Sequence, residues 1–162
     1  MGTIDSPRPT NSPTPRSAVA IALAAGCLVL VAFQAALACG APFGAATQGG
    51  TNPGQLPPDL RLLSGVVAVV WLVAALVVLA RAGRPVVPVR QPVHLVGAWV
   101  LVGVLSIGTM LNFASSSAWE RFGWGPFALL MLVLAVVLAR SSLPITPAAA
   151  QLGNRAREGQ GV

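Results

Sequence analysis

The sequence is poor in the residues that cover the surface of water-soluble proteins. It contains no lysine and no tyrosine, one histidine, and only 9% charged residues among its 162, while 55% are hydrophobic. Its mean hydropathy is +0.77. Soluble domains carry about 25% charged residues. Because so few charges cannot cover a water-facing surface, the composition predicts a single membrane-embedded unit.

The scarcity of histidine, cysteine and acid also excludes several kinds of site. Cys27 and Cys39 are too far apart along a helix to form a disulfide, and no CxxC pair or Cys/His cluster occurs. Phosphate-binding glycine motifs, serine-hydrolase arrangements and HExxH are missing. The ten arginines stand singly at the ends of apolar runs, without the basic stripe of a nucleic-acid interface. We therefore expect no catalytic residues, no metal, no cofactor and no nucleic-acid partner.

Apolar runs long enough to cross a bilayer are the main feature that is present. There are four, at about residues 18–38, 62–80, 95–113 and 122–140. The fourth reaches spanning length only if it begins near Phe122. Only helices satisfy their own backbone in lipid without closing into a barrel, and no alternating barrel pattern occurs. The sequence predicts an all-α, integral membrane protein, with four antiparallel transmembrane helices in a domain of residues 17–140.

The arginines predict the orientation of these helices. They concentrate in the N-terminal segment, in the connection that follows residue 80 and in the C-terminal segment. Four crossings place these three segments on one side, and arginine-rich segments stay in the cytoplasm. We expect a multi-pass protein of the plasma membrane with both termini cytoplasmic. Residues 1–16 and 141–162 lack the apolar residues needed for a core, which predicts disordered cytoplasmic tails.

The end of the first run also resembles a cleavage site. Ala36 and Ala38 form an Ala-x-Ala pattern directly before Cys39, which a signal peptidase can read. The apolar run is longer than that of a signal peptide, and Ala36 stands where a lipoprotein signal normally has leucine. We expect an uncleaved helix. Removal of residues 1–38 is the alternative, and it leaves the predicted orientation of the other helices unchanged.

Polar residues gather in the two connections that are expected to face outward. The candidate site consists of Asp59, Arg61, Asn112, Ser115, Glu120 and Arg121. Asp59 is suited to capping the second helix. Glu120 and Arg121 are adjacent and therefore point in different directions. We expect Glu120 to pair with Arg61, or Arg121 with Asp59, because these are the nearest opposite charges on the same side of the membrane. An ion pair is favoured over an active site, because the third connection contains no histidine, tyrosine, lysine or cysteine for acid–base catalysis.

The third run carries a slanted polar row of Ser106, Thr109 and Asn112, which Gly103 extends as a surface of small residues. Small and hydroxyl-bearing residues let transmembrane helices approach and hydrogen-bond one another. Packing against a neighbouring helix is the expected role of this row, and a path for a small molecule is the alternative. Trp71 and Trp99 are expected to pack within the bundle.

Two segments form a recognisable pattern. GAPFGAATQGG and LPPDLRLLSG contain Gly-x-Pro-x-Gly, Gly-Gly and Leu-Pro with an arginine entering a helix; LNFASSSAWERFGWGP contains Asn-x-x-Ser, Glu-Arg and Trp-x-Pro. Over about residues 30–140 the chain thus resembles small four-helix integral membrane proteins of high-GC Gram-positive bacteria. Gln48 stands where that pattern often has tryptophan. The family carries no assigned activity, so the resemblance implies the topology and the outward polar cluster, and no reaction.

These observations favour a non-enzymatic accessory or interaction protein. Its expected partners are the lipid bilayer and either another membrane protein or a second copy of itself. The alternative is a small transporter or ligand-binding membrane protein that uses the outer connections.

Overall fold

The computed structural model describes residues 15–82 and 91–141, and this part of the chain is all-helical, without a strand. The long helices are α1 (Pro15–Ala38), α2 (Pro58–Arg81), α3 (Gln91–Ala114) and α4 (Gly125–Arg140). Two short 3-10 helices, η1 (Gly44–Ala46) and η2 (Gln48–Gly50), lie between α1 and α2. A π-helical turn, η3 (Glu120–Trp124), leads directly into α4. The predicted tails, 1–16 and 141–162, lie outside the described residues except at their inner ends.

Four helices of the described chain are long and apolar enough to cross a membrane, as the sequence predicted. Their spanning parts are Arg16–Ala38, Pro58–Arg81, Leu95–Ala114 and Glu120–Arg140. The fourth reaches this length because η3 extends α4 toward its N-terminus. The span thus starts at Glu120, two residues before the predicted start near Phe122.

The start of α2 differs from the sequence prediction. The helix begins at Pro58 rather than near residue 62, so Asp59 and Arg61 belong to the helix itself. Pro57 is the N-cap residue, and no side chain caps the helix by a hydrogen bond. The prediction that Asp59 caps the helix is therefore wrong. Its exposed carboxylate lies in the first turn, where it still interacts favourably with the helix dipole.

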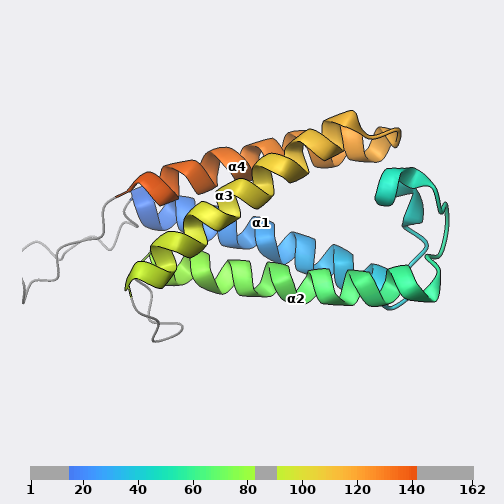
Figure 1. Ribbon diagram of the computed structural model, residues 1–162, viewed down its shortest axis with the longest axis horizontal. Helices are drawn as coiled ribbons and strands as arrows, with labels where there is room; N and C mark the ends of the chain where they lie inside the picture. Colours follow the sequence, from blue (N-terminus) through green and yellow to red (C-terminus); the bar gives the residue numbers. More distant parts are fainter. Residues whose placement is uncertain (1–14, 83–90, 142–162) are drawn as a thin grey trace, which may run out of the picture.

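The helices pack as two pairs, α1 with α2 and α3 with α4 (Figure 1). The pairs lie close together at the end where α1 starts and α4 finishes, and they diverge toward the other end. At the divergent end, η1 and η2 lie between the two pairs (Figure 1). The irregular connection after α1 therefore occupies the space between the two helix pairs at this end of the bundle.

Small side chains form much of the contact surface between the helices. Ala20, Ala24, Ala75 and Ala135 are buried, and an added Cβ at Gly26 would lie 2.1 Å from the sulfur of Met131. Small residues permit such close approach of helix backbones. Large apolar residues point outward instead, including Leu62 (74% exposed) and Met110 (72% exposed). This distribution is the reverse of the one that water imposes.

The two tryptophans expected within the bundle behave differently. Trp71 packs against the buried core. Trp99 is 47% exposed on the outer surface of α3, so the prediction that it packs within the bundle is wrong. The polar row of this apolar run begins only at Ser106, beyond Trp99, so the sequence around Trp99 gives no indication of its direction.

Arg81 joins three helices at the convergent end. Its side chain is only 4% exposed, and its Nη2 donates to the carbonyl oxygens of Ala139, at 3.4 Å, and of Ser141. Arg16 of α1 donates to the carbonyl oxygen of Arg81. The last carbonyls of a helix have no partner within it. Arg81 therefore satisfies the end of α4 and fixes it to α2, a role beyond the orientation signal read from the sequence.

Replacing this arginine with an apolar residue of similar length, Arg81→Met, should leave the α4 carbonyls without a donor. We expect a loss of about 1–3 kcal/mol in the free energy of unfolding, measured by denaturation in mixed detergent micelles. Arg140→Met is the matched control. Arg140 is the exposed last residue of α4, so this substitution should change stability little. Equal stability of the two variants would show that Arg81 does not hold the helices together.

Candidate functional site

Side chains that follow α3 bind the backbone of the connection between α1 and α2. The Ser117 hydroxyl donates to the carbonyl oxygen of Ala45 at 2.7 Å, and the Ser116 hydroxyl donates to that of Gly49 at 2.9 Å. The Gly49 N–H donates to Oε2 of Glu120 at 3.0 Å. We call residues 44–50 together with 115–124 the clasp. The clasp joins the two helix pairs at their divergent end.

The backbone of η2 takes a shape that exposes its polar groups to this partner. Gln48, Gly49 and Gly50 all have positive φ, at 51°, 72° and 70°. Glycine adopts this left-handed region readily, whereas other residues do so at a cost. At Gly50 an added Cβ would also lie 3.3 Å from Cβ of Ser117 and 3.2 Å from the carbonyl oxygen of Ala45. The Gly-Gly pair of the sequence thus permits both the turn and the close contact.

Ser115 and Trp124 complete the clasp. The Ser115 hydroxyl donates to the Glu120 carboxylate, and its oxygen accepts the N–H of Ser117 at 3.0 Å. Arg121 donates from Nε and Nη2 to the carbonyl oxygen of Ser115, at 3.1 and 2.6 Å. The Trp124 indole N–H donates to the carbonyl oxygen of Ala46 at 3.0 Å. These bonds fix the Glu120 carboxylate and the Trp124 ring relative to the connection.

Both ion pairs expected from the sequence are wrong for the described chain. Nε of Arg61 donates to the carbonyl oxygen of Ala38 at 3.1 Å, so it caps the end of α1 instead of meeting Glu120. Arg121 bonds within its own connection, and Asp59 is exposed, away from the clasp bonds. Exposed ion pairs contribute about 0–1 kcal/mol. A buried backbone carbonyl without a hydrogen-bond donor costs about 1–3 kcal/mol, which is more than an exposed ion pair contributes. The two arginines therefore bond to backbone carbonyls rather than to carboxylates.

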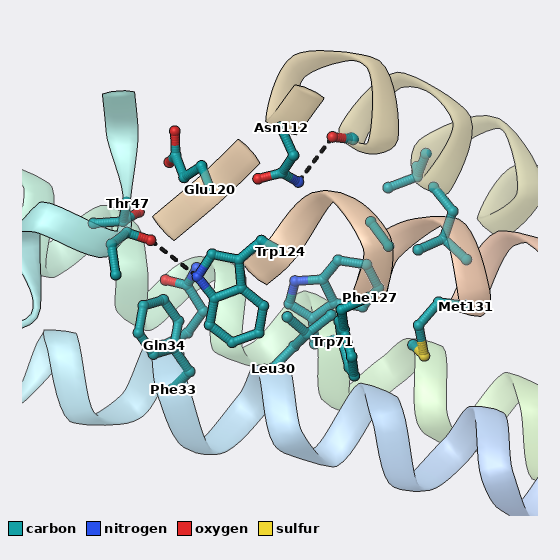
Figure 2. A pocket seen from close by; sticks show the side chains of 15 residues that line it. Leu30, Phe33, Gln34, Thr47, Trp71, Asn112, Glu120, Trp124, Phe127 and Met131 are labelled. Atoms are coloured by element: carbon teal, nitrogen blue, oxygen red, sulfur yellow. Dashed lines mark hydrogen bonds between the residues drawn. The ribbon is translucent and has the colours of Figure 1, made fainter. Parts of the chain in front are cut away.

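Below the clasp, the helices surround a cavity of about 180 Å³ (Figure 2). Its polar lining residues lie toward the clasp: Gln34, Thr47, Asn112 and Glu120. The remaining lining is mainly apolar and includes Leu30, Phe33, Trp71, Trp124, Phe127 and Met131. Two of the six candidate residues, Asn112 and Glu120, therefore line the cavity. Ser115 supports Glu120, whereas Asp59, Arg61 and Arg121 lie outside the cavity lining.

The polar row on α3 is satisfied within its own helix. Ser106, Thr109 and Asn112 donate to the carbonyl oxygens four residues earlier, at 2.8, 2.7 and 2.8 Å. Only Asn112 of this row lines the cavity. Its Nδ2 makes the bond to the Gly108 carbonyl, which Figure 2 shows as a dashed line.

Two other polar groups of the cavity lining lack a protein partner. Neither the Gln34 amide nor the Thr47 hydroxyl makes a side-chain hydrogen bond to any residue that the structure describes. Both residues are half-buried. Their polar atoms are not fully buried, so either water or a ligand can bond to them. The cavity therefore offers both space and hydrogen-bonding capacity to a guest.

Aromatic rings form one side of the cavity. The ring centroids of Phe33 and Trp124 are 4.7 Å apart, and those of Trp124 and Phe127 are 5.6 Å apart with an edge-to-face arrangement. The Trp71 ring also lies against this space (Figure 2). These residues come from α1, α2, η3 and α4, so no local sequence pattern reveals the group. Gln34, a single polar residue within an otherwise apolar run, is a sequence signal for a polar environment at this part of α1.

The arrangement is suited to binding. Among the residues that the structure describes, Glu120 is the only charged one in the cavity lining. General acid–base catalysis needs a positioned proton donor or acceptor at the reacting atom, usually in a pair with opposite roles. Among the residues described, no three His, Cys, Asp or Glu side chains gather as metal ligands.

No family model, curated protein or solved structure matches the chain.

Gly44 tests the packing of the clasp. It is buried in η1 and donates from its N–H to the carbonyl oxygen of Gly54 at 2.8 Å. An added Cβ would lie 1.9 Å from the carbonyl oxygen of Asn52, a backbone atom that cannot rotate away. We expect Gly44→Ala to lower the free energy of unfolding by about 1–3 kcal/mol and to make the connection sensitive to protease.

Gly103→Ala is the matched control for Gly44→Ala, because an added Cβ there meets no heavy atom within 4 Å. Its stability should equal or slightly exceed that of the wild type. If Gly44→Ala behaved in the same way, the close packing of η1 would be contradicted.

Proposed function

We propose that the chain is a multi-pass protein of the plasma membrane, with four antiparallel helices and both termini in the cytoplasm. Support comes from the four apolar helices, from the large apolar side chains on their outer faces and from the arginine-rich segments that four crossings put on one side. In this orientation Arg81 lies at the inner leaflet, and the clasp faces the cell exterior. The polar clasp then has water beside it, as its exposed serine and arginine require.

The two cysteines test this orientation, because Cys39 is exposed beside the clasp and Cys27 is buried in α1. A membrane-impermeant maleimide should label intact cells at Cys39 alone, so that Cys39→Ser abolishes the signal. A cysteine at the C-terminus, Val162→Cys in the Cys39→Ser background, should react only after the membrane is opened. The opposite pattern would reverse the proposed orientation.

We propose further that the protein is non-enzymatic and binds a small ligand in the cavity below the clasp. The observation that carries this proposal is the cavity itself, about 180 Å³ in volume, with an apolar floor and polar groups that lack protein partners. An apolar cavity of about 150 Å³ is enough to hold benzene. The expected ligand therefore has about the size of one aromatic ring, with a polar end that faces Gln34 and Asn112.

Methionine methyl groups report this binding separately from partitioning into detergent. Met131 lines the cavity, whereas Met110 is 72% exposed on the outer face of α3. In protein labelled with ¹³C at the methionine methyls, benzene should shift the Met131 resonance in a saturable manner. The Met110 resonance should follow only the gradual change that the detergent itself undergoes.

Two glycines of α3 provide the matched variants. Gly108 lines the cavity and Gly103 does not, and an added Cβ at either meets no heavy atom within 4 Å. Gly108→Leu should fill the cavity and abolish the Met131 shift, whereas Gly103→Leu should retain it. Binding that survives Gly108→Leu, or that never saturates in the wild type, would refute the cavity as a ligand site.

A second function, that of an accessory or interaction protein, is favoured by the open space over Gly103. This glycine is exposed on α3 between outward-facing Val100, Val104 and Ile107. Small residues at such positions let another transmembrane helix approach. The same variants separate the two functions, because Gly103→Leu should release a co-purifying partner or second copy while Gly108→Leu should keep it.

A further inference from the structure

Glu120 is the one charged residue that faces the cavity, and it also faces a second hollow. A surface depression of about 390 Å³ is lined by Gln48, Gly49, Leu111, Asn112, Ser115, Ser116 and Glu120. Asn112 and Glu120 belong to both linings, so they stand where the depression and the cavity adjoin. Glu120 therefore lies between the outer depression and the cavity and contributes its side chain to both.

This carboxylate has no cationic partner among the residues that the structure describes. Its Oε2 accepts the Gly49 N–H and the Ser115 hydroxyl. Arg121, the neighbour of Glu120 in sequence, donates to the carbonyl oxygen of Ser115 instead. Arg61, the partner expected from the sequence, donates to the carbonyl oxygen of Ala38. The two hydrogen bonds that Glu120 accepts come from neutral groups and leave its negative charge without a compensating positive charge, so the carboxylate attracts cations. The missing countercharge points to a positively charged ligand.

The aromatic side of the cavity suits the same charge. Phe33, Trp71, Trp124 and Phe127 all line it. The Trp124 ring is held by its bond to Ala46 and by contact with two of the other rings. The faces of tryptophan and phenylalanine rings attract organic ammonium groups, and rings that surround such a group form the aromatic cages that bind choline and methylated amines. An alkylated cation satisfies the rings and the carboxylate together, whereas a hydrated metal ion would not use the rings.

We propose that the ligand of the cavity is a small organic cation with an alkylated ammonium group, which reaches the cavity from the outer depression past Glu120. This inference rests on the proposed function, because it names the class of ligand for the same cavity. The ammonium group lies against the aromatic rings with Glu120 as its countercharge. A hydroxyl or other polar end on the ligand meets the Gln34 amide and the Thr47 hydroxyl.

The test compares choline with 3,3-dimethylbutan-1-ol, which has the same shape but a neutral carbon in place of the ammonium nitrogen. Both are titrated into the full chain in detergent micelles, with the Met131 methyl resonance as the readout and Met110 as the reference for partitioning. We expect choline to bind about tenfold more tightly than the alcohol. Equal affinities, or tighter binding of the alcohol, would overturn the inference.

Two amide substitutions locate the charge that is responsible. Glu120→Gln keeps an oxygen that can accept from Gly49 and Ser115, and it should weaken choline binding about tenfold while leaving the alcohol unaffected. Asp59→Asn is the matched control, because Asp59 is the other acid among the described residues and lies outside both linings. If both variants weakened choline equally, a general surface potential rather than Glu120 would attract the cation, and the inference would fail.

The outcomes separate this inference from the proposed function. Saturable binding of benzene without preferential binding of choline retains the cavity as a ligand site and rejects the organic cation. Absence of binding by benzene, choline and the alcohol rejects both. If Glu120→Gln loses the dispersed Met131 signal of the folded protein, the comparison of choline and alcohol in the wild type decides alone.

Discussion

An irregular backbone segment needs hydrogen-bond partners that it cannot supply itself, and in this protein another connection supplies them. The segment between α1 and α2 contains five residues of positive φ, three of them consecutive at positions 48–50, and so presents carbonyl and N–H groups in several directions. Ser116, Ser117, Glu120 and Trp124 bond to four of these groups. Each bond contributes about 1 kcal/mol, and leaving a buried group unpaired costs about 1–3 kcal/mol. Because the bound segment occupies the space between the helix pairs, the pairs diverge there and the cavity lies beneath it (Figure 1).

The two ends of the bundle follow the same rule with different residues. At the convergent end, Arg81 donates to carbonyls at the end of α4, and Arg16 donates to the carbonyl of Arg81. At the divergent end, hydroxyls, one carboxylate and one indole bond to backbone. Between these ends the contacts are mostly of small apolar residues, such as Ala24, Gly26 and Ala135. Small residues permit the close packing on which dispersion between helices depends.

The sequence predicted the four apolar helices, because run length and polarity are local properties. It predicted the partners within the polar cluster incorrectly. Pairing Glu120 with Arg61 considered only charges, whereas the folded chain satisfies backbone groups whose positions depend on the turn at Gln48 and Gly49. The cavity could not be predicted, since Phe33, Trp71 and Trp124 come from distant parts of the chain and only tertiary packing brings them together. Gln34 was a visible anomaly, but no neighbour in sequence shows what it faces.

The polar side chains of α3 donate hydrogen bonds to carbonyl oxygens of their own helix, and this has a consequence for how polar the surface of the helix is. A helix that carries Ser106, Thr109 and Asn112 would normally need a companion before it could leave the aqueous translocation channel, since unsatisfied polar side chains are costly in hydrocarbon. Each of these side chains bonds instead to a carbonyl in the preceding turn of α3. These bonds lower the cost of placing the three side chains in an apolar environment without a partner helix.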